Sequence, residues 1–327
     1  MAPENIQTSQ SQPGLISALK AGFETVANHL VLILFPVVLD LFIWLGPRYR
    51  LTGIIQAFSQ EALSSPEAAT AEAAQAVQLS REVWDFVAER MNLTSFLRSF
   101  PVGIPSLMAG RLPVLHPAGE PLQVDIASPL SALLLWVAFT LIGLLIGTFY
   151  YNVTAQAALA GKVDWIQAFK SLPWSVYQVV LLAVFWAVLL LVVSIPSACV
   201  MIVLVFSNAA MGQLGLFVYF GLLLWFLLPL FLSAHGIILY RLRAKEAILR
   251  SVQITRWNLS KTGMFFLCVI LISQGLDIVW NTPAEDTWMM LIGLGGHGLV
   301  ATALLAASFV YYRQTDLAVQ RRLGLMT

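Results

Sequence analysis

The stretch SLPWSVYQVVLLAVFWAVLLLVVSIPSACVMIVLVFSNAAMGQLGLFVYFGLLLWFLLPLFLSAHGIILY, residues 171–240, contains no Asp, Glu, Lys or Arg. A helix needs about 20 apolar residues to cross about 30 Å of hydrocarbon, so this stretch is too long for one span. It divides at the small and polar run 207–212, which predicts two long helices at 176–206 and 213–240. Kinks are expected at Pro196 and Pro229, and membranes tolerate them where neighbouring groups satisfy the freed carbonyls.

Composition extends this result to the whole chain. Hydrophobic residues make up 59% of the 327 residues, charged residues make up 11%, and the mean hydropathy is +0.81, which excludes a soluble globular protein. Aromatic residues at 11% exclude a disordered or collagen-like chain, and two cysteines, Cys199 and Cys268, exclude a disulfide scaffold. We interpret both cysteines as buried apolar side chains. The net charge of +1 provides no field that attracts nucleic acid, so no nucleic-acid partner is expected.

The sequence predicts an all-α integral membrane protein with six transmembrane helices, arranged as three hairpins that are each preceded by an amphipathic interfacial helix. The spans are expected at 26–46, 130–151, 176–206, 213–240, 264–281 and 288–312. Interfacial helices are expected within 1–25, together with the cytoplasmic tail, at 152–175, and in the basic segment 241–263. An extracytoplasmic insert at 47–129 and a cytoplasmic tail at 313–327 complete the chain.

Basic residues indicate which side of the membrane each loop faces, because cytoplasmic loops carry an excess of Lys and Arg. Twelve of the 18 Lys and Arg residues fall in the termini and even-numbered loops, and the short loops 207–212 and 282–287 carry none. We therefore expect a multi-pass protein of the bacterial plasma (inner) membrane with both termini in the cytoplasm. Arg48 and Arg50 directly follow the first span and favour the opposite orientation. No cleavable signal peptide is predicted, because a polar stretch precedes a full-length span.

A basic, amphipathic segment precedes three of the spans. Residues 19–28 and 249–258 share Leu, a cation, Thr and Asn at the same offsets, and residues 165–175 form a looser copy. Either the chain contains three repeated units, or these are ordinary juxtamembrane segments, which tend to be basic and aromatic. In both cases they are expected to contact the lipid bilayer and its anionic lipid headgroups on the cytoplasmic side. The predicted headgroup contacts are Lys20, Lys170, Trp174, Arg250, Arg256, Trp257 and Lys261.

The same rhythm of amphipathic basic helix and paired long spans, seen at residues 18–36, 164–183 and 247–266, carries a family resemblance. It resembles the bacterial six-span families related to the membrane domain of glycerophosphodiester phosphodiesterases. The stretches FPVVLDLFIWLGPR (35–48) and FPVGIPSLM (100–108) also look similar to uncharacterised membrane proteins from Chloroflexota-type bacteria. In the phosphodiesterase family the activity belongs to a separate soluble barrel, so the resemblance implies a fold and no reaction.

The insert is expected to hold one long helix and a proline-rich segment. A Ser-Pro-Glu helix start at 65–67 predicts a helix to about residue 91. Five prolines between residues 96 and 122 exclude a continuous helix there, so this part is expected to lie on the outer membrane surface or to cap the spans. The apolar face of the long helix is expected to consist of Leu79, Val83, Phe86, Val87 and Met91.

Asp40 and Asp277 are the acidic residues within the predicted spans. An acid near the centre of a span costs about 2.5 to 3.5 kcal/mol, which makes each of them a candidate for an intramembrane polar site. Both lie in the outer third of outward-running helices, where water, Arg48 or Arg50 can reach them. Two alternatives follow: a structural role at the outer mouth of the protein, or an ion or proton site.

No catalytic residue, metal ligand or cofactor is predicted. His29, His235 and His297 share no metal-ligand spacing, and His116 lies in the proline-rich segment. The chain has no HExxH motif, nucleophile elbow or phosphate-binding loop. The glycines at 293–298 and the pair Gly143 and Gly147 are typical of close helix packing.

The sequence favours a non-enzymatic membrane protein that acts in membrane organisation or assembly, or as a subunit of a larger complex, with protein partners and oligomeric state left open. The alternative is a small transporter or channel with an outward-facing acidic site. A third class is an interfacial lipid-modifying enzyme, for which His29, His235 and Arg256 are the first groups to inspect. A transporter requires a polar path to the acids, a scaffold requires a dry packed interior, and an enzyme requires a polar cleft at headgroup depth.

Overall fold

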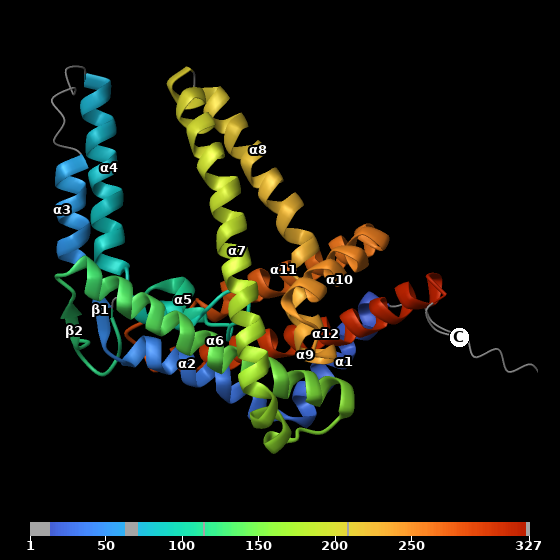
Figure 1. Ribbon diagram of the computed structural model, residues 1–327. Helices are drawn as coiled ribbons and strands as arrows, with labels where there is room; N and C mark the ends of the chain where they lie inside the picture. Colours follow the sequence, from blue (N-terminus) through green and yellow to red (C-terminus); the bar gives the residue numbers. More distant parts are fainter. Residues whose placement is uncertain (1–13, 63–70, 114, 208, 325–327) are drawn as a thin grey trace, which may run out of the picture.

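A computed structural model describes residues 14–62, 71–113, 115–207 and 209–324 of the chain. The described part is almost entirely helical, with one short two-stranded ribbon (Figure 1). The α-helices are α1 (Leu15–Asn28), α2 (Leu34–Leu45), α3 (Thr52–Ala62), α4 (Ala71–Arg90), α5 (Leu107–Arg111), α6 (Pro129–Ala160), α7 (Trp165–Ser207), α8 (Ala209–Leu227), α9 (Ser233–Tyr240), α10 (Ala244–Trp257), α11 (Leu259–Trp280) and α12 (Met290–Arg322). The 3-10 helices are η1 (Leu30–Ile33), η2 (Leu93–Leu97) and η3 (Leu228–Leu230), and the strands are β1 (Arg48–Arg50) and β2 (Gln123–Asp125).

Within the described residues, five helical segments are long and apolar enough to cross a membrane: Pro129–Ala160, Trp165–Met201, Ala210–Tyr240, Leu259–Trp280 and Met290–Arg322. The helices Leu15–Asn28 and Leu30–Leu45 pass the same test only as a pair, which is bent by 95°. The chain therefore has the architecture of an all-α, multi-pass membrane protein with five spans, or six if the bent pair is one span.

Helix α12 forms the centre of the structure. In its most apolar window 61% of the residues are buried, against 22% or less in the other four span segments. It contacts α1, α2, α6 and α11. Glycines allow these helices to pack closely. A Cβ on Gly22 of α1 would lie 2.3 Å from the carbonyl oxygen of Ala303 on α12, and a Cβ on Gly298 of α12 would lie 3.2 Å from Pro36 of α2. The close helix packing expected around residues 293–298 is thus confirmed.

Helices α1 and α10 have 14 residues each, and each ends at a similar break before a membrane helix. His29 after α1 has φ −137° and ψ 59°, and Asn258 after α10 has φ −135° and ψ 37°. The first span, expected as one helix over 26–46, is divided at His29. The shared geometry supports the repeat for two of its copies. The third copy, residues 165–175, is the first part of α7 and has no break after it.

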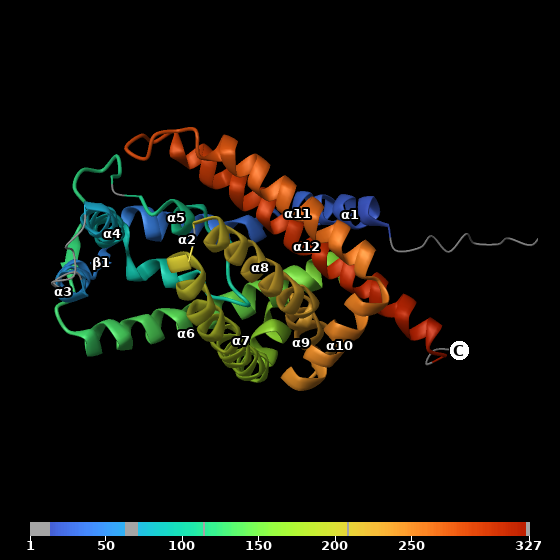
Figure 2. The ribbon, with the colours of Figure 1, turned by 90° about the horizontal axis from the view of Figure 1, so that it is seen from above.

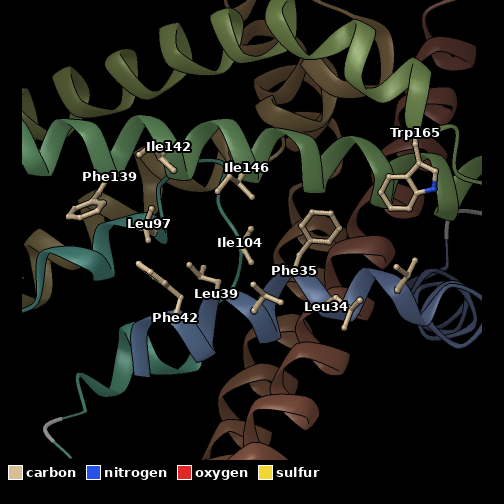
Figure 3. A pocket seen from close by; sticks show the side chains of 12 residues that line it. Leu34, Phe35, Leu39, Phe42, Leu97, Ile104, Phe139, Ile142, Ile146 and Trp165 are labelled. Carbon is tan, nitrogen blue, oxygen red and sulfur yellow. The ribbon is translucent and has the colours of Figure 1, made fainter. Parts of the chain in front are cut away.

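The arrangement of the spans differs from three equivalent hairpins. Helices α7 and α8 run side by side and rise steeply from the layer of α2, α6 and α12 (Figure 1), while α11 and α12 lie together (Figure 2). Helices α2 and α6 are instead held apart, because Leu97 and Ile104 of the insert lie between them (Figure 3). Helices α6 and α7 together occupy most of the expected interfacial segment 152–175, and α12 continues to Arg322, beyond the expected end of the sixth span.

The insert folds back against the protein and closes on itself. Strands β1 and β2 pair in parallel, with Arg48 opposite Gln123, and so join its two ends. Arg48 is buried and donates a hydrogen bond to the carbonyl of Pro113; burial lowers the pKa of its guanidinium, and nearby Glu285 opposes that change. The backbone N–H of Leu115 donates to Glu285 Oε2 (3.3 Å), so the insert and the 282–287 loop lie on the same side of the protein.

The long helix of the insert is α4, which is accompanied by α3 (Figure 1). The expected helix start at 65–67 lies outside the described residues. Rings of Phe58 on α3 and Trp84 on α4 meet edge to face at 5.5 Å. Val83 and Phe86, expected on an apolar face, are 55% and 57% exposed, so this part of the face is not covered by the described chain.

Candidate intramembrane polar site

A polar cavity of about 880 Å³ lies between α11, α12 and the insert segment 98–111. Its wall on α11 extends from Phe266 to Asn281, and its wall on α12 from His297 to Ser308. At 1.5 Å per residue the α11 wall is about 22 Å long, which is most of the roughly 30 Å of hydrocarbon in a bilayer. The polar lining consists of Arg98, Ser99, Ser106, Arg111, Tyr151, His235, Ser273, Gln274, Asp277, Asn281, His297 and Ser308.

Asp277 on α11 and His297 on α12 form a hydrogen-bonded pair in this cavity. Nδ1 of His297 lies 2.8 Å from Oδ1 of Asp277. A carboxylate bound to one imidazole nitrogen fixes the ring orientation and keeps the proton on that nitrogen. Nε2 of His297 is buried and has no hydrogen-bond partner among the described residues. The pair therefore holds an oriented imidazole whose second nitrogen is available to a bound solute.

His235 on α9 forms the second histidine site of the cavity. Nε2 of His235 lies 2.7 Å from Ser308 Oγ, and Ser308 Oγ also lies 2.7 Å from the carbonyl oxygen of Leu305. Nδ1 of His235 is buried and has no hydrogen-bond partner in the described part of the chain. His235 therefore adds a second buried imidazole to the cavity wall.

Two arginines of the insert line the end of the cavity that the insert forms. Arg111 Nη1 donates to the carbonyl oxygens of residues 281 and 283 (3.1 and 3.0 Å), and Arg98 Nη1 donates to that of Ser106 (3.3 Å). Among the described residues, neither guanidinium lies within ion-pair distance of a carboxylate. Asp277 is the one acidic side chain among the described residues of the lining. The two guanidinium groups therefore favour an anionic solute over a cation, whereas Nε2 of His297, with the proton on Nδ1, accepts a hydrogen bond from water or from a hydroxyl group of the solute.

Asp40, the other acid expected in the spans, is fully buried beside the cavity and does not line it. Its carboxylate accepts hydrogen bonds from Ser106 Oγ (2.5 Å), Leu107 N (3.2 Å) and Met108 N (3.0 Å). These groups form the N-terminal turn of α5, whose N–H groups have no partner within the helix. Asp40 interacts electrostatically with His297, but no direct contact joins it to Asp277 in the described structure. The geometry supports a structural role, in which Asp40 fastens the insert to α2.

An apolar plug closes the cavity at the end nearer Tyr240. It consists of the buried residues Ala155, Ile238 and Phe309, packed by Tyr151, Leu239 and Leu305. Tyr151 and Leu305 also line the polar cavity, whereas Ala155, Ile238 and Leu239 line a second pocket beyond the plug. The rings of Tyr151 and Phe309 meet edge to face at 5.8 Å. Residues of three helices, α6, α9 and α12, thus form an apolar barrier between the two cavities.

A third cavity is an apolar groove of about 620 Å³ between α2 and α6 (Figure 3). The insert backbone reaches it because two glycines of α6 leave room. A Cβ on Gly143 would lie 2.4 Å from the carbonyl oxygen of Leu97, and one on Gly147 would lie 2.8 Å from the Cα of Gly103. The close helix packing expected of this pair is thus found at Gly143 against the 3-10 helix η2, whereas Gly147 packs against the irregular segment that follows it. The side chains around the groove include Leu34, Phe35, Leu39, Phe42, Leu97, Ile104, Phe139, Ile142, Ile146 and Trp165.

The predicted headgroup contacts differ in exposure. Arg250 and Trp174 are partly buried: Arg250 Nε lies 2.6 Å from Oδ1 of the buried Asp316, and Trp174 lies 5.0 Å from the guanidinium of Arg241. Contact of any of the seven with lipid stays a prediction. The exposed ones are Lys20, which lies 3.7 Å from Glu24, and Lys170, Arg256, Trp257 and Lys261.

Some residues that line the cavity were not predicted from the sequence as site residues. Gln274 had a usable signal, because Gln274, Asp277 and Asn281 recur at spacings of three and four residues on one face of an apolar span. Arg98 and Arg111 had none, because the irregular chain that carries them has no periodicity. The approach of His297 to Asp277 depends on the register of two helices and has no sequence signal of its own.

The groups expected for an interfacial enzyme do not lie together at the cavity. His235 lines it, whereas His29 and Arg256 do not. Within the described ranges, no group of three or more His, Cys, Asp or Glu side chains is placed to hold a metal ion.

Comparison of the chain with protein-family models, curated proteins and solved structures found no match, so its resemblance to the six-span families stays a prediction.

Proposed function

We propose that this protein is a transporter or channel that binds a small anionic solute in the polar cavity between α11, α12 and the insert. The observation that carries the proposal is the cavity of about 880 Å³ along two spanning helices, with buried imidazole nitrogens of His235 and His297 that have no partner among the described residues. Unsatisfied polar groups in hydrocarbon are costly, so water in the cavity, or a hydroxyl group of the bound solute, accounts for them. A dry, packed scaffold does not.

The lining supports an anion of modest size. The cavity falls in the range of about 300–1,000 Å³ that small-molecule sites occupy. Arg98 and Arg111 each keep guanidinium N–H groups beyond those used in their backbone contacts, and the guanidinium fork matches carboxylate and phosphate oxygens. No chemical step is part of the proposal.

Passage requires movement of the apolar plug. Apolar constrictions can stop conduction by excluding water, and the plug of Ala155, Ile238 and Phe309 separates the polar cavity from the pocket beyond it. The insert would lie outside the bacterial inner membrane and both termini in the cytoplasm. The contact between Leu115 and Glu285 supports this topology, because it joins two segments that the basic-residue distribution assigns to one side.

Flux into liposomes tests the proposal. Vesicles containing the purified protein are exposed to chloride, acetate and inorganic phosphate as anionic probes, and to Na⁺ and glycerol as cationic and neutral probes. We expect at least one anion to enter faster than into empty liposomes, and we expect His297→Gln to reduce that flux at least tenfold. Ile278→Ala, on the exposed face of α11, is the matched control and should leave it unchanged. Selective passage of Na⁺, or no flux of any probe through folded protein, would overturn the proposal.

A second candidate function is a lipid-engaging role in membrane organisation, and the groove between α2 and α6 favours it. The groove is lined by apolar side chains and ends at Trp165, a residue type found at membrane interfaces, so an acyl chain fits its chemistry. Filling the groove with Ile142→Trp tests this role. The substitution should lower the amount of co-purified phospholipid, measured by mass spectrometry, and leave anion flux intact; unchanged lipid content would reject it.

A further inference from the structure

We propose that the pocket beyond the plug is a separate binding site for a phosphate group. It has a volume of about 520 Å³ and is formed by the ends of α6 and α9, the first turns of α7 and part of α12. Lys170 of α7, Arg241 at the end of α9 and Arg313 of α12 line it together. No Asp or Glu is among the described residues of its lining. The site does not depend on the proposed function, because it requires no passage of a solute.

The positive charges of this basic pocket are not neutralised by the protein. Within the described ranges, no carboxylate lies within ion-pair distance of Lys170, Arg241 or Arg313. Two acids that lie close to lining residues along the chain, Asp164 and Asp316, have other partners. Asp164 accepts the backbone N–H of residue 167 at the start of α7 (2.9 Å), and Asp316 accepts from Arg250 Nε (2.6 Å) and from residue 320 (2.7 Å). Three uncompensated cations around one concavity concentrate anions there.

Asn152 provides an independent indication of a ligand. This residue of α6 is 7% exposed and lines the pocket, and its Nδ2 has no hydrogen-bond partner among the described residues. A buried amide donor without a partner destabilises the folded state, and an oxygen of a bound phosphate would satisfy it. Gln156 adds a second donor, because its Oε1 already accepts from the N–H of Asp164 (2.7 Å), which leaves its Nε2 to donate.

The backbone conformation of Arg241 also supports a binding site in this pocket. Arg241 ends α9 with φ 51°, in the left-handed region where glycine is favoured. Its guanidinium lies over the ring of Trp174, 5.0 Å from the centroid. Strained residues of this kind gather at functional sites, because the side chain is needed at a place that the backbone does not favour. The stacked arginine is thereby oriented for a bidentate contact with phosphate oxygens.

The phosphate can come from an anionic lipid headgroup or from a free phosphate compound, since both offer the same oxygens. The experiment separates these sources in detergent-solubilised full-length protein. Binding is measured by intrinsic tryptophan fluorescence and by thermal stability, with phosphatidylglycerol in one arm, inorganic phosphate in the second, and zwitterionic phosphatidylcholine as the reference lipid. The variants are Lys170→Gln and Arg313→Gln, and Lys245→Gln is the matched control because it removes an exposed cation that neither lines the pocket nor belongs to the predicted headgroup contacts.

We expect phosphatidylglycerol or inorganic phosphate to bind in preference to phosphatidylcholine, with affinity reduced at least tenfold in each pocket variant and less than twofold in Lys245→Gln. Binding of phosphatidylglycerol alone identifies a headgroup site, and binding of inorganic phosphate identifies a site for free phosphate. Loss of affinity to the same extent in Lys245→Gln would mean general surface attraction and would overturn the proposal. Absence of binding by either probe to protein with a wild-type thermal transition would also overturn it.

Discussion

Substitution of Asp40 separates the roles of the two acids that lie in the apolar helices. In wild-type protein three donors from the first turn of α5 meet the Asp40 carboxylate: Ser106 Oγ, Leu107 N and Met108 N, at 2.5, 3.2 and 3.0 Å. Asp40→Ala removes the acceptor and leaves these donors in a site where Asp40 itself is fully buried. Asp40→Asn retains one acceptor oxygen but removes the charge.

The expected loss of stability follows from this geometry. A hydrogen bond to a charged group contributes about 1.5–3 kcal/mol, so three of them set an upper bound of about 4.5–9 kcal/mol for Asp40→Ala. Removal of the carboxylate also removes the cost of burying it, which offsets part of that loss. We therefore expect Asp40→Ala to lower the free energy of unfolding by about 3–5 kcal/mol, in the range seen when one member of a buried polar pair is removed. Asp40→Asn should cost about 1–3 kcal/mol.

Thermal unfolding in detergent, followed by tryptophan fluorescence, measures the effect. At roughly 2–4 °C per kcal/mol, Asp40→Ala should lower Tm by about 6–20 °C. Glu24→Ala, at an exposed position of α1, is the control and should leave Tm within about 1 °C. Asp277→Asn should reduce anion flux and should lower Tm less than Asp40→Ala does. A Tm for Asp40→Ala that equals the wild-type value, or a flux that falls with Asp40→Asn at unchanged stability, would refute the structural role of Asp40.

Three further predictions concern packing and the plug. Phe309→Ala removes a fully buried ring of the plug and should raise the leak of small anions through proteoliposomes severalfold, at a stability cost of about 3–5 kcal/mol; an unchanged leak in folded protein would exclude the plug as the barrier. Gly147→Leu should prevent the insert from lying against α6 and increase its cleavage by protease, because even a Cβ would approach the Cα of Gly103 to 2.8 Å; wild-type protection would contradict this packing. Arg250→Gln leaves the carboxylate of Asp316 buried without its ion-pair partner and should cost about 2–4 kcal/mol in denaturant unfolding, whereas a cost below about 1 kcal/mol would show that the pair is not coupled to folding.

The presence of five apolar spans could be predicted because hydrocarbon thickness sets the shortest helix that crosses a bilayer. Their full lengths could not, since α6 runs from Pro129 to Ala160 where a span over 130–151 was expected. The run without charges at 171–240 predicted two long helices, and the structure has α7 followed by α8, η3 and α9 there. Boundaries were less predictable. Pro173 lies inside α7 and does not end it, since in a membrane protein neighbouring groups can satisfy the carbonyl that a proline leaves without a donor. The expected interfacial helix at 152–175 is therefore not separate from the span.

The candidate site could be predicted only in part. Asp277 was singled out because an acid in an apolar helix is rare, but its partner His297 lies twenty residues away on another helix. Their approach is set by the packing of α11 against α12, which no local pattern encodes. Asp40 gave the same signal as Asp277, yet the structure gives it different partners. The difference depends on α5, a five-residue helix in the insert that is too short to produce a periodic pattern.

The polar cavity is the central claim, and thiol labelling at Gln274 tests it most directly. Single cysteines replace Gln274, which lines the cavity, and Leu271, which is 62% exposed on the outer surface of the same helix. The background lacks Cys199 and Cys268, and a membrane-impermeant thiol reagent is added from outside to protein in liposomes. We predict that the cysteine at 274 reacts at least ten times faster than the one at 271, and that inorganic anions slow its labelling. Equal, slow labelling at both positions in folded protein of the proposed orientation would contradict a water-accessible cavity and with it the proposed transport function.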